Sequence, residues 1–69
     1  MVEVFKTNIS SKTIADKLSS ELRQLFQFTA VSFDLDDCDN ILRVKGESIH
    51  SPHIISHLQS QGHFCEVLE

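Results

Sequence analysis

Histidines and cysteines are the residues of this sequence that can bind a soft or borderline metal ion. His53 and His57 lie four residues apart, so a helix would carry both imidazoles on one face, where they can chelate zinc, nickel or copper. Two ligands alone make a weak site, and the segment around them contains no carboxylate. The alternative is that both are rim or exposed histidines with no ligand.

Cys38 and His63 form a second candidate pair, because the fold expected below brings both to the same end of the molecule. With Ser10 or Ser11 between them, they could make a substitute Cys/His metal site. The alternative is that Cys38 is an exposed turn residue and His63 a residue at a strand edge. Cys65 falls on the inward side of a strand alternation, which predicts a small buried side chain. Two cysteines do not make a disulfide framework, and we expect both thiols to be free.

Aspartates crowd one short stretch of the chain, at positions Asp34, Asp36, Asp37 and Asp39. Clustered carboxylates can hold Ca²⁺ or Mg²⁺, but the loop of about 12 residues with a central Gly and a closing Glu is missing. Two other interpretations stay open. The stretch can be a solvated hairpin tip, or it can be an acidic patch that speeds the docking of a basic protein partner.

Several functional classes are disfavoured by composition and pattern. Ser, His and Asp all occur, but no catalytic constellation stands out, so we expect no enzyme. The six Lys and Arg residues are scattered and the net charge is −4, which argues against a nucleic-acid partner. The sequence contains no run of about 18 apolar residues, so no membrane span is expected. Met1 leads directly into a strand pattern without a signal-peptide pattern, and we expect a cytoplasmic protein.

Periodicity predicts four strands and two helices. Strands are expected over Val2–Lys6, Phe28–Leu35, Ile41–Gly46 and His63–Leu68, and helices over Thr13–Phe26 and from Ser51 to near Gln61. Ser10 or Ser11 is expected to cap the first helix, and Ser51, followed by Pro52, to cap the second. Gly62 is expected to end the second helix in a left-handed conformation. The predicted apolar stripe of the first helix is Ile14, Leu18, Leu22 and Leu25, flanked by Ala15 and Phe26.

The element order β-α-β-β-α-β, with right-handed crossovers, predicts an α+β ferredoxin-like sandwich as a single domain over residues 1–69. The sheet is antiparallel in the order 4-1-3-2, with both helices on one face. One end of this fold collects the Thr7–Lys12 turn, the Asp36–Asn40 hairpin tip and the Gly62–His63 turn. Strands two and four have unpaired edges, so the chain is expected to be a monomer or a weak edge-strand dimer.

Certain apolar residues, together with the last residues of the chain, carry a family resemblance. The apolar residues are Val4 and the pairs Ile14/Leu18, Val31/Phe33, Leu42/Val44 and Ile54/Leu58. The closing stretch is Gly62-His63-Phe64-Cys65-Glu66-Val67. In these features and in element order, essentially the whole chain resembles a heavy-metal-associated domain, the fold of small copper chaperones and of the N-terminal modules of metal-transporting ATPases. The resemblance implies a soft-metal site made by a CxxC pair in the first turn and helix start. Those positions fall near Thr7 and Ser10, whose hydroxyls are neither soft nor charged at neutral pH, so the usual metal site cannot be carried over.

Two hypotheses follow from these observations. The first is a small non-enzymatic protein-interaction module without a cofactor, which contacts another protein through the first-turn end; its candidate surface is Ser10, Ser11, Asp36, Asp37 and Asp39. The second is a metal-binding or trafficking protein that holds copper or zinc weakly through substituted ligands, with Cys38, His63, His53 and His57 as candidates.

Overall fold

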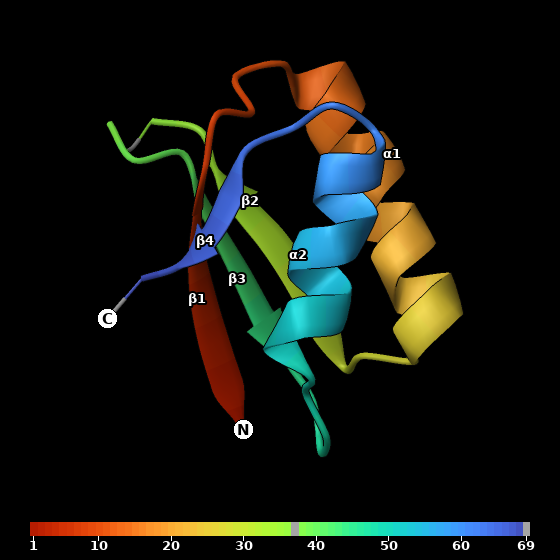
Figure 1. The fold of residues 1–69 in the computed structure, drawn as a ribbon. Helices are drawn as coiled ribbons and strands as arrows, with labels where there is room; N and C mark the ends of the chain where they lie inside the picture. Colours follow the sequence, from red (N-terminus) through yellow and green to blue (C-terminus); the bar gives the residue numbers. More distant parts are fainter. Residues whose placement is uncertain (37, 69) are drawn as a thin grey trace.

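The computed structural model describes residues 1–36 and 38–68, and its elements follow the predicted order. They are β1 (Val2–Thr7), α1 (Lys12–Phe26), β2 (Ala30–Asp34), β3 (Ile41–Lys45), α2 (Ser51–Ser60) and β4 (Cys65–Val67). The strands form one antiparallel sheet in the order β2-β3-β1-β4, which is the predicted order counted from the other edge. Both helices cover the same face of the sheet (Figure 1), so the α+β ferredoxin-like fold is confirmed.

The hydrophobic core lies between the sheet and the two helices. Its largest fully buried side chains come from β1, α1, β3 and α2 and are Phe5, Leu18, Leu22, Leu42, Val44, Ile54 and Leu58. On β2, Val31 and Phe33 lie opposite Val44 and Leu42 in the register and are half-buried against the margin of this core. The strand is therefore half-buried, as its alternation predicts.

The buried face of α1 differs from the predicted stripe. Ala15, Leu18 and Leu22 are buried, whereas Ile14 is 38% exposed and Leu25 is 60% exposed. The prediction for Leu25 is wrong because a helix advances by about 3.6 residues per turn. In the last turn the core-facing position is therefore Phe26, which packs partly buried against the core.

The N-termini of the two helices are capped differently. Ser11 caps α1, because its Oγ accepts the Ile14 N–H at 3.3 Å, as predicted. In α2 the cap position is His50, which makes no side-chain cap hydrogen bond. The prediction that Ser51 caps α2 is wrong by one position. The His53 N–H donates to the His50 carbonyl at 2.9 Å, and this bond draws Ser51 into the first turn of the helix.

The C-terminus of α2 also explains why β4 is shorter than the predicted His63–Leu68. Gly62 adopts φ 85°, as predicted, and its N–H donates to the Gln59 carbonyl. The His63 N–H donates to the Leu58 carbonyl, which completes the closing pattern of the helix. Since His63 is bonded to the helix and the Phe64 N–H to the Asn8 side chain, pairing with β1 begins only at Cys65.

The connections gather at the two ends of the sheet as expected. The β1–α1 turn, the β2–β3 hairpin tip and the α2–β4 turn lie at one end, and the β3–α2 connection lies at the other, near the N-terminus (Figure 1). The N-terminal amine donates to the Gly46 carbonyl at 2.9 Å there. Neither of the described helices has the length and apolar character needed to cross a membrane.

Candidate functional site

Thr7, the last residue of β1, stabilises the first turn through buried hydrogen bonds. It is only 4% exposed. Its Oγ1 donates to the Asn40 carbonyl at 2.6 Å and accepts the Ile9 N–H at 3.1 Å, and its own N–H donates to the Asp39 carbonyl at 3.2 Å. At this position, where the family resemblance would place a metal thiol, the chain has a hydroxyl whose hydrogen bonds are all internal.

The rest of the first turn is divided between an anchored and an exposed part. Ile9 is buried in the core, and Ser11 is committed to capping α1. Ser10 is exposed. Of the two serines predicted on a contact surface, Ser10 therefore presents a free surface, while Ser11 is half-buried and structural.

The hairpin tip presents part of the predicted acidic patch. Asp36 is exposed, and its N–H donates to Oδ1 of Asp34 at 3.3 Å. Asp39 lies 3.7 Å from the Nζ of Lys6, so one of the acidic side chains is paired with a cation. Asp37 lies outside the described residues. The acidic character of the tip is thus reduced but not cancelled.

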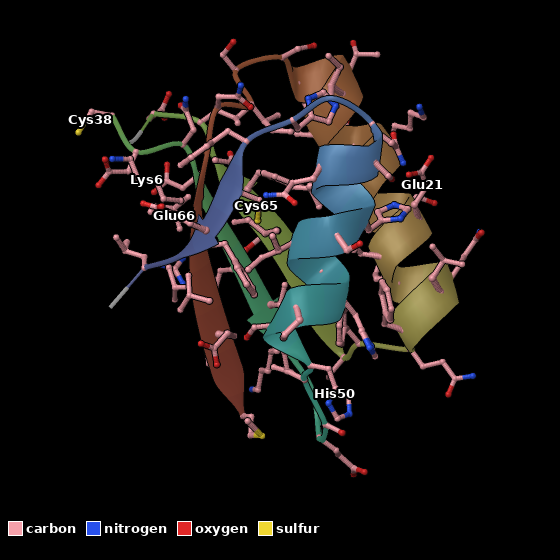
Figure 2. The ribbon with its side chains drawn as sticks, viewed as in Figure 1. Lys6, Glu21, Cys38, His50, Cys65 and Glu66 are labelled. Atoms are coloured by element: carbon pink, nitrogen blue, oxygen red, sulfur yellow. The ribbon has the colours of Figure 1, made fainter. Side chains whose placement is uncertain are left out.

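Cys38 and His63 both lie at the first-turn end, as predicted. Cys38 is exposed on the hairpin tip, where its thiol points away from the body of the protein (Figure 2). His63 is half-buried in the turn between α2 and β4. Across residues 1–36 and 38–68, no three His, Cys, Asp or Glu side chains form a group that can hold a metal ion.

Cys65 is a buried free thiol, as the strand alternation predicts, and is 3% exposed. Burial raises the pKa of this thiol to about 11, and the nearby carboxylate of Glu66 adds to the effect. The thiol is therefore protonated at neutral pH, and a protonated thiol is a poor metal ligand.

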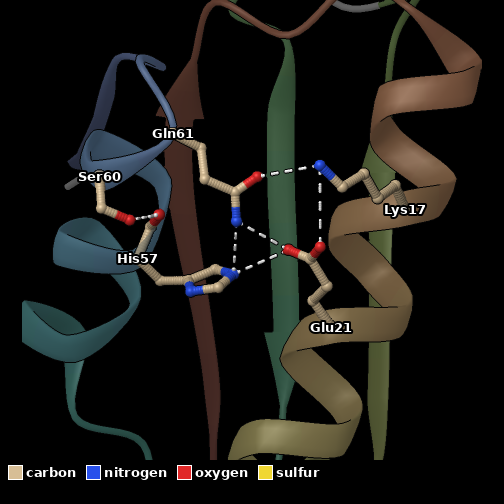
Figure 3. A network of polar contacts seen from close by, with 5 residues as sticks. All are labelled: Lys17, Glu21, His57, Ser60 and Gln61. Atoms are coloured by element: carbon tan, nitrogen blue, oxygen red, sulfur yellow. Dashed lines mark hydrogen bonds and ion pairs between the residues drawn. The ribbon is translucent and has the colours of Figure 1, made fainter.

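His57 faces the other helix and takes part in a polar network there (Figure 3). Its Nε2 lies 3.0 Å from Oε1 of Glu21, and the Nε2 of Gln61 donates to the same oxygen at 2.8 Å. Lys17 lies 3.9 Å from the other carboxylate oxygen. The hydrogen bonds from Gln61 and His57 lower the pKa of Glu21 below its ordinary value of 4.5.

The two histidines of the predicted pair, His53 and His57, therefore have different surroundings. His53 is exposed and stacks on the ring of Phe26, with ring centroids 6.5 Å apart, whereas His57 contacts the same ring edge-on and binds Glu21. Sequence reasoning missed Glu21 because it lies on the other helix, 36 residues from His57. Only the packing of the two helices side by side brings these groups together.

Comparisons with known proteins bear on the fold. No protein-family model matches the sequence, and no curated protein matches it significantly. The yeast copper transporter domain Ccc2a, whose solution structure was determined in the apo and Cu(I)-loaded states, is similar with a TM-score of 0.83. The similarity covers 99% of this chain and 94% of that chain at 17% identity. The chain therefore has the heavy-metal-associated type of fold, as the sequence resemblance predicts.

Replacing Thr7 tests whether its side-chain hydrogen bonds stabilise the first turn. Thr7→Val keeps the shape but leaves the Ile9 N–H and the Asn40 carbonyl without their partner, so we expect a loss of about 1–3 kcal/mol in the free energy of unfolding. Chemical denaturation measures this loss. Thr13→Val, at an exposed helix position, is the control and should change stability by less than about 0.5 kcal/mol. Equal stability of the two variants would contradict the assignment.

The lowered pKa of Glu21 predicts a pH dependence of stability. A carboxylate whose pKa is lower in the folded state stabilises fully above its unfolded pKa, and this contribution is lost as the pH falls through the folded pKa. The thermal midpoint of Glu21→Gln should therefore fall less than that of the parent chain between about pH 5 and about pH 3. Glu47→Gln, at an exposed position, should keep the parent slope. Identical slopes in both variants would refute the role of Glu21.

Proposed function

We propose that this chain is a non-enzymatic module that binds another protein through its first-turn end, using the heavy-metal-associated type of fold as a scaffold. The observation that carries the proposal is Phe64, which is 45% exposed beside a first turn in which the Thr7 hydroxyl is bonded internally. We place the module in the cytoplasm, where free cysteines persist.

The backbone of Phe64 is held next to the first turn. Its N–H donates to Oδ1 of Asn8 at 3.0 Å, which ties the α2–β4 turn to the β1–α1 turn. A large aromatic ring on a fixed backbone loses little conformational freedom on binding, and aromatic residues are enriched at the centres of protein interfaces. Phe64 therefore supplies the apolar anchor of the proposed surface, and the first turn adds two exposed polar residues, Asn8 and Ser10.

The charges around this anchor favour a basic partner. Lys6 lies opposite Glu66 in the register of β1 and β4, and it also pairs with Asp39. Two carboxylates thus flank a single lysine, and exposed Asp36 adds a further negative charge at the tip. Complementary charge of this kind speeds association more than it tightens binding, and salt screens it.

Two exposed apolar residues allow a matched test of this surface. Three baits are used in parallel quantitative affinity captures: the parent chain, the Phe64→Ser variant and the Leu25→Ser variant. Each recovered protein is then purified, and its affinity for the three baits is measured by titration. We expect a partner whose affinity falls roughly tenfold to a hundredfold with Phe64→Ser, the effect of losing an interface anchor. Leu25→Ser, on α1, should leave the affinity unchanged. A partner insensitive to Phe64→Ser would contradict the proposed surface.

A second candidate function is metal binding through substituted ligands. It is favoured by the likeness to Ccc2a, whose structure is described in a Cu(I)-loaded state. Cys38 and His63 at the first-turn end, or His53 and His57 on α2, would then hold copper or zinc. Cys38 is the stronger ligand candidate of the two cysteines, since it is exposed while Cys65 is buried and protonated.

Metal titration separates the two functions. Cu(I), Zn²⁺ and Ni²⁺ are added in turn at neutral pH while backbone NMR shifts are followed. If the chain is an interaction module, we expect NMR shift changes only at His53 and His57, and only at high metal concentration. Sub-micromolar binding with shifts at Cys38 or His63 would overturn it in favour of metal carriage. In that case Cys38→Ser must weaken the binding, because a hydroxyl replaces the soft ligand.

A further inference from the structure

The two edges of the sheet differ in how well they are protected against pairing. β4 is three residues long and has an exposed glutamate, Glu66, at its centre. Short strands and charged side chains are common means of blocking an edge. β2 is five residues long, lacks Lys, Pro and Gly, and has Asp34 at its end as its only charge. Its outer backbone groups face no strand of the described sheet.

A groove of about 520 Å³ runs along this open edge, between β2 and α1. Val31, Phe33 and Leu35 line it and are only half-buried, so another strand placed on this edge would remove further apolar surface from water. On the helix side the lining residues include Ala15 and Ser19, whose small side chains leave space along the groove.

The groove has opposite charges at its two ends. α1 and β2 run in opposite directions (Figure 1), so the start of α1 lies at the same end as the hairpin tip. At this end the groove is lined by Asp16, Asp36 and Lys12, and Lys12 pairs with Asp16 at 3.2 Å. At the other end it is lined by Arg23, in the last turn of α1. The guanidinium of Arg23 makes no hydrogen bond or ion pair within the described part of the chain.

We infer that a second copy of this chain occupies the groove, with its β2 antiparallel to the first. An antiparallel pair of identical strands has a two-fold axis through its centre, near Ser32, so both copies use the same surface. The axis places Arg23 of each copy at the acidic end of the other copy's groove, near Asp16 and Asp36. The two four-stranded sheets then become one continuous sheet with all the helices on the same face.

The charge pattern selects this occupant over others. A parallel β2–β2 pair would have its two-fold axis along the strands, which puts the helices of the two copies on opposite faces of the sheet. Arg23 of one copy would then lie away from the acidic end of the other copy's groove. An unrelated extended segment gains the same backbone hydrogen bonds but must supply a basic and an acidic group at the correct ends. A second copy supplies both from the same residues. One short strand and one helix face make a small interface, so the dimer dissociates on dilution.

Sedimentation equilibrium of the full chain over a range of concentrations tests the dimer. The parent chain should show a monomer–dimer equilibrium, which Arg23→Glu weakens at least tenfold by bringing like charges together. The double variant Asp16→Arg/Asp36→Arg should be weakened similarly. An equimolar mixture of these two variants should recover the dimer, because each variant restores the opposite-sign contacts that the other lacks.

Two controls sharpen the outcome. Gln24→Glu adds negative charge at an exposed α1 position that does not line the groove, and should leave the equilibrium unchanged. Phe64→Ser should also dimerise as the parent does, which separates this inference from the proposed function. A parent chain that stays monomeric at millimolar concentration would overturn the inference. The inference would also be overturned if the mixture of the two variants did not recover the dimer. The same holds if the backbone amide NMR shifts that change with concentration lay on β4 and not on β2.

Discussion

One hydrophobic core, made by Phe5 of β1, Leu42 and Val44 of β3 and the inner faces of both helices, sets the arrangement of the molecule. A chain of this length has few large apolar side chains, and most of them pack on one face of the sheet. Both helices must therefore lie side by side over that face. Because the strands are antiparallel, three connections meet at one end of the sheet, and β2 and β4 stand as its edges.

The first turn shows how this core constrains chemistry. Ile9 is drawn into the core, which pulls the turn against the hairpin tip, and Thr7 bonds to both segments. A metal carrier needs deprotonated soft ligands at an accessible turn. Here the turn offers a buried hydroxyl, while the exposed thiol of Cys38 lies on the neighbouring tip. The functional question therefore concerns the surface around the turn more than the turn itself.

Local patterns predict the fold well, because strand alternation and helix periodicity report directly on which side faces the core. The half-burial of Val31 and Phe33 and the left-handed Gly62 follow from such patterns. Features that depend on how elements pack together are not predictable in this way. The Glu21–His57 contact requires α1 and α2 to be placed side by side, and the β2 groove depends on the small Ala15 and Ser19 facing the edge strand. The misplaced cap at Ser51 reflects one backbone hydrogen bond, from His53 to His50, that no residue type signals.

The two proposed surfaces meet at Asp36, which lines the acidic end of the β2 groove and belongs to the hairpin tip of the first-turn end. In the dimer this carboxylate faces Arg23 of the other copy, and in the interaction module it faces a basic partner. One negative charge cannot be neutralised fully by two cations from different directions, so each binding event weakens the electrostatic part of the other. By linkage the coupling is reciprocal: a basic partner would favour the monomer to the same degree that dimerisation disfavours the partner. Because Phe64 lies outside the groove lining, the apolar part of partner binding is independent of dimerisation, and the coupling is carried by charge and weakens as salt rises.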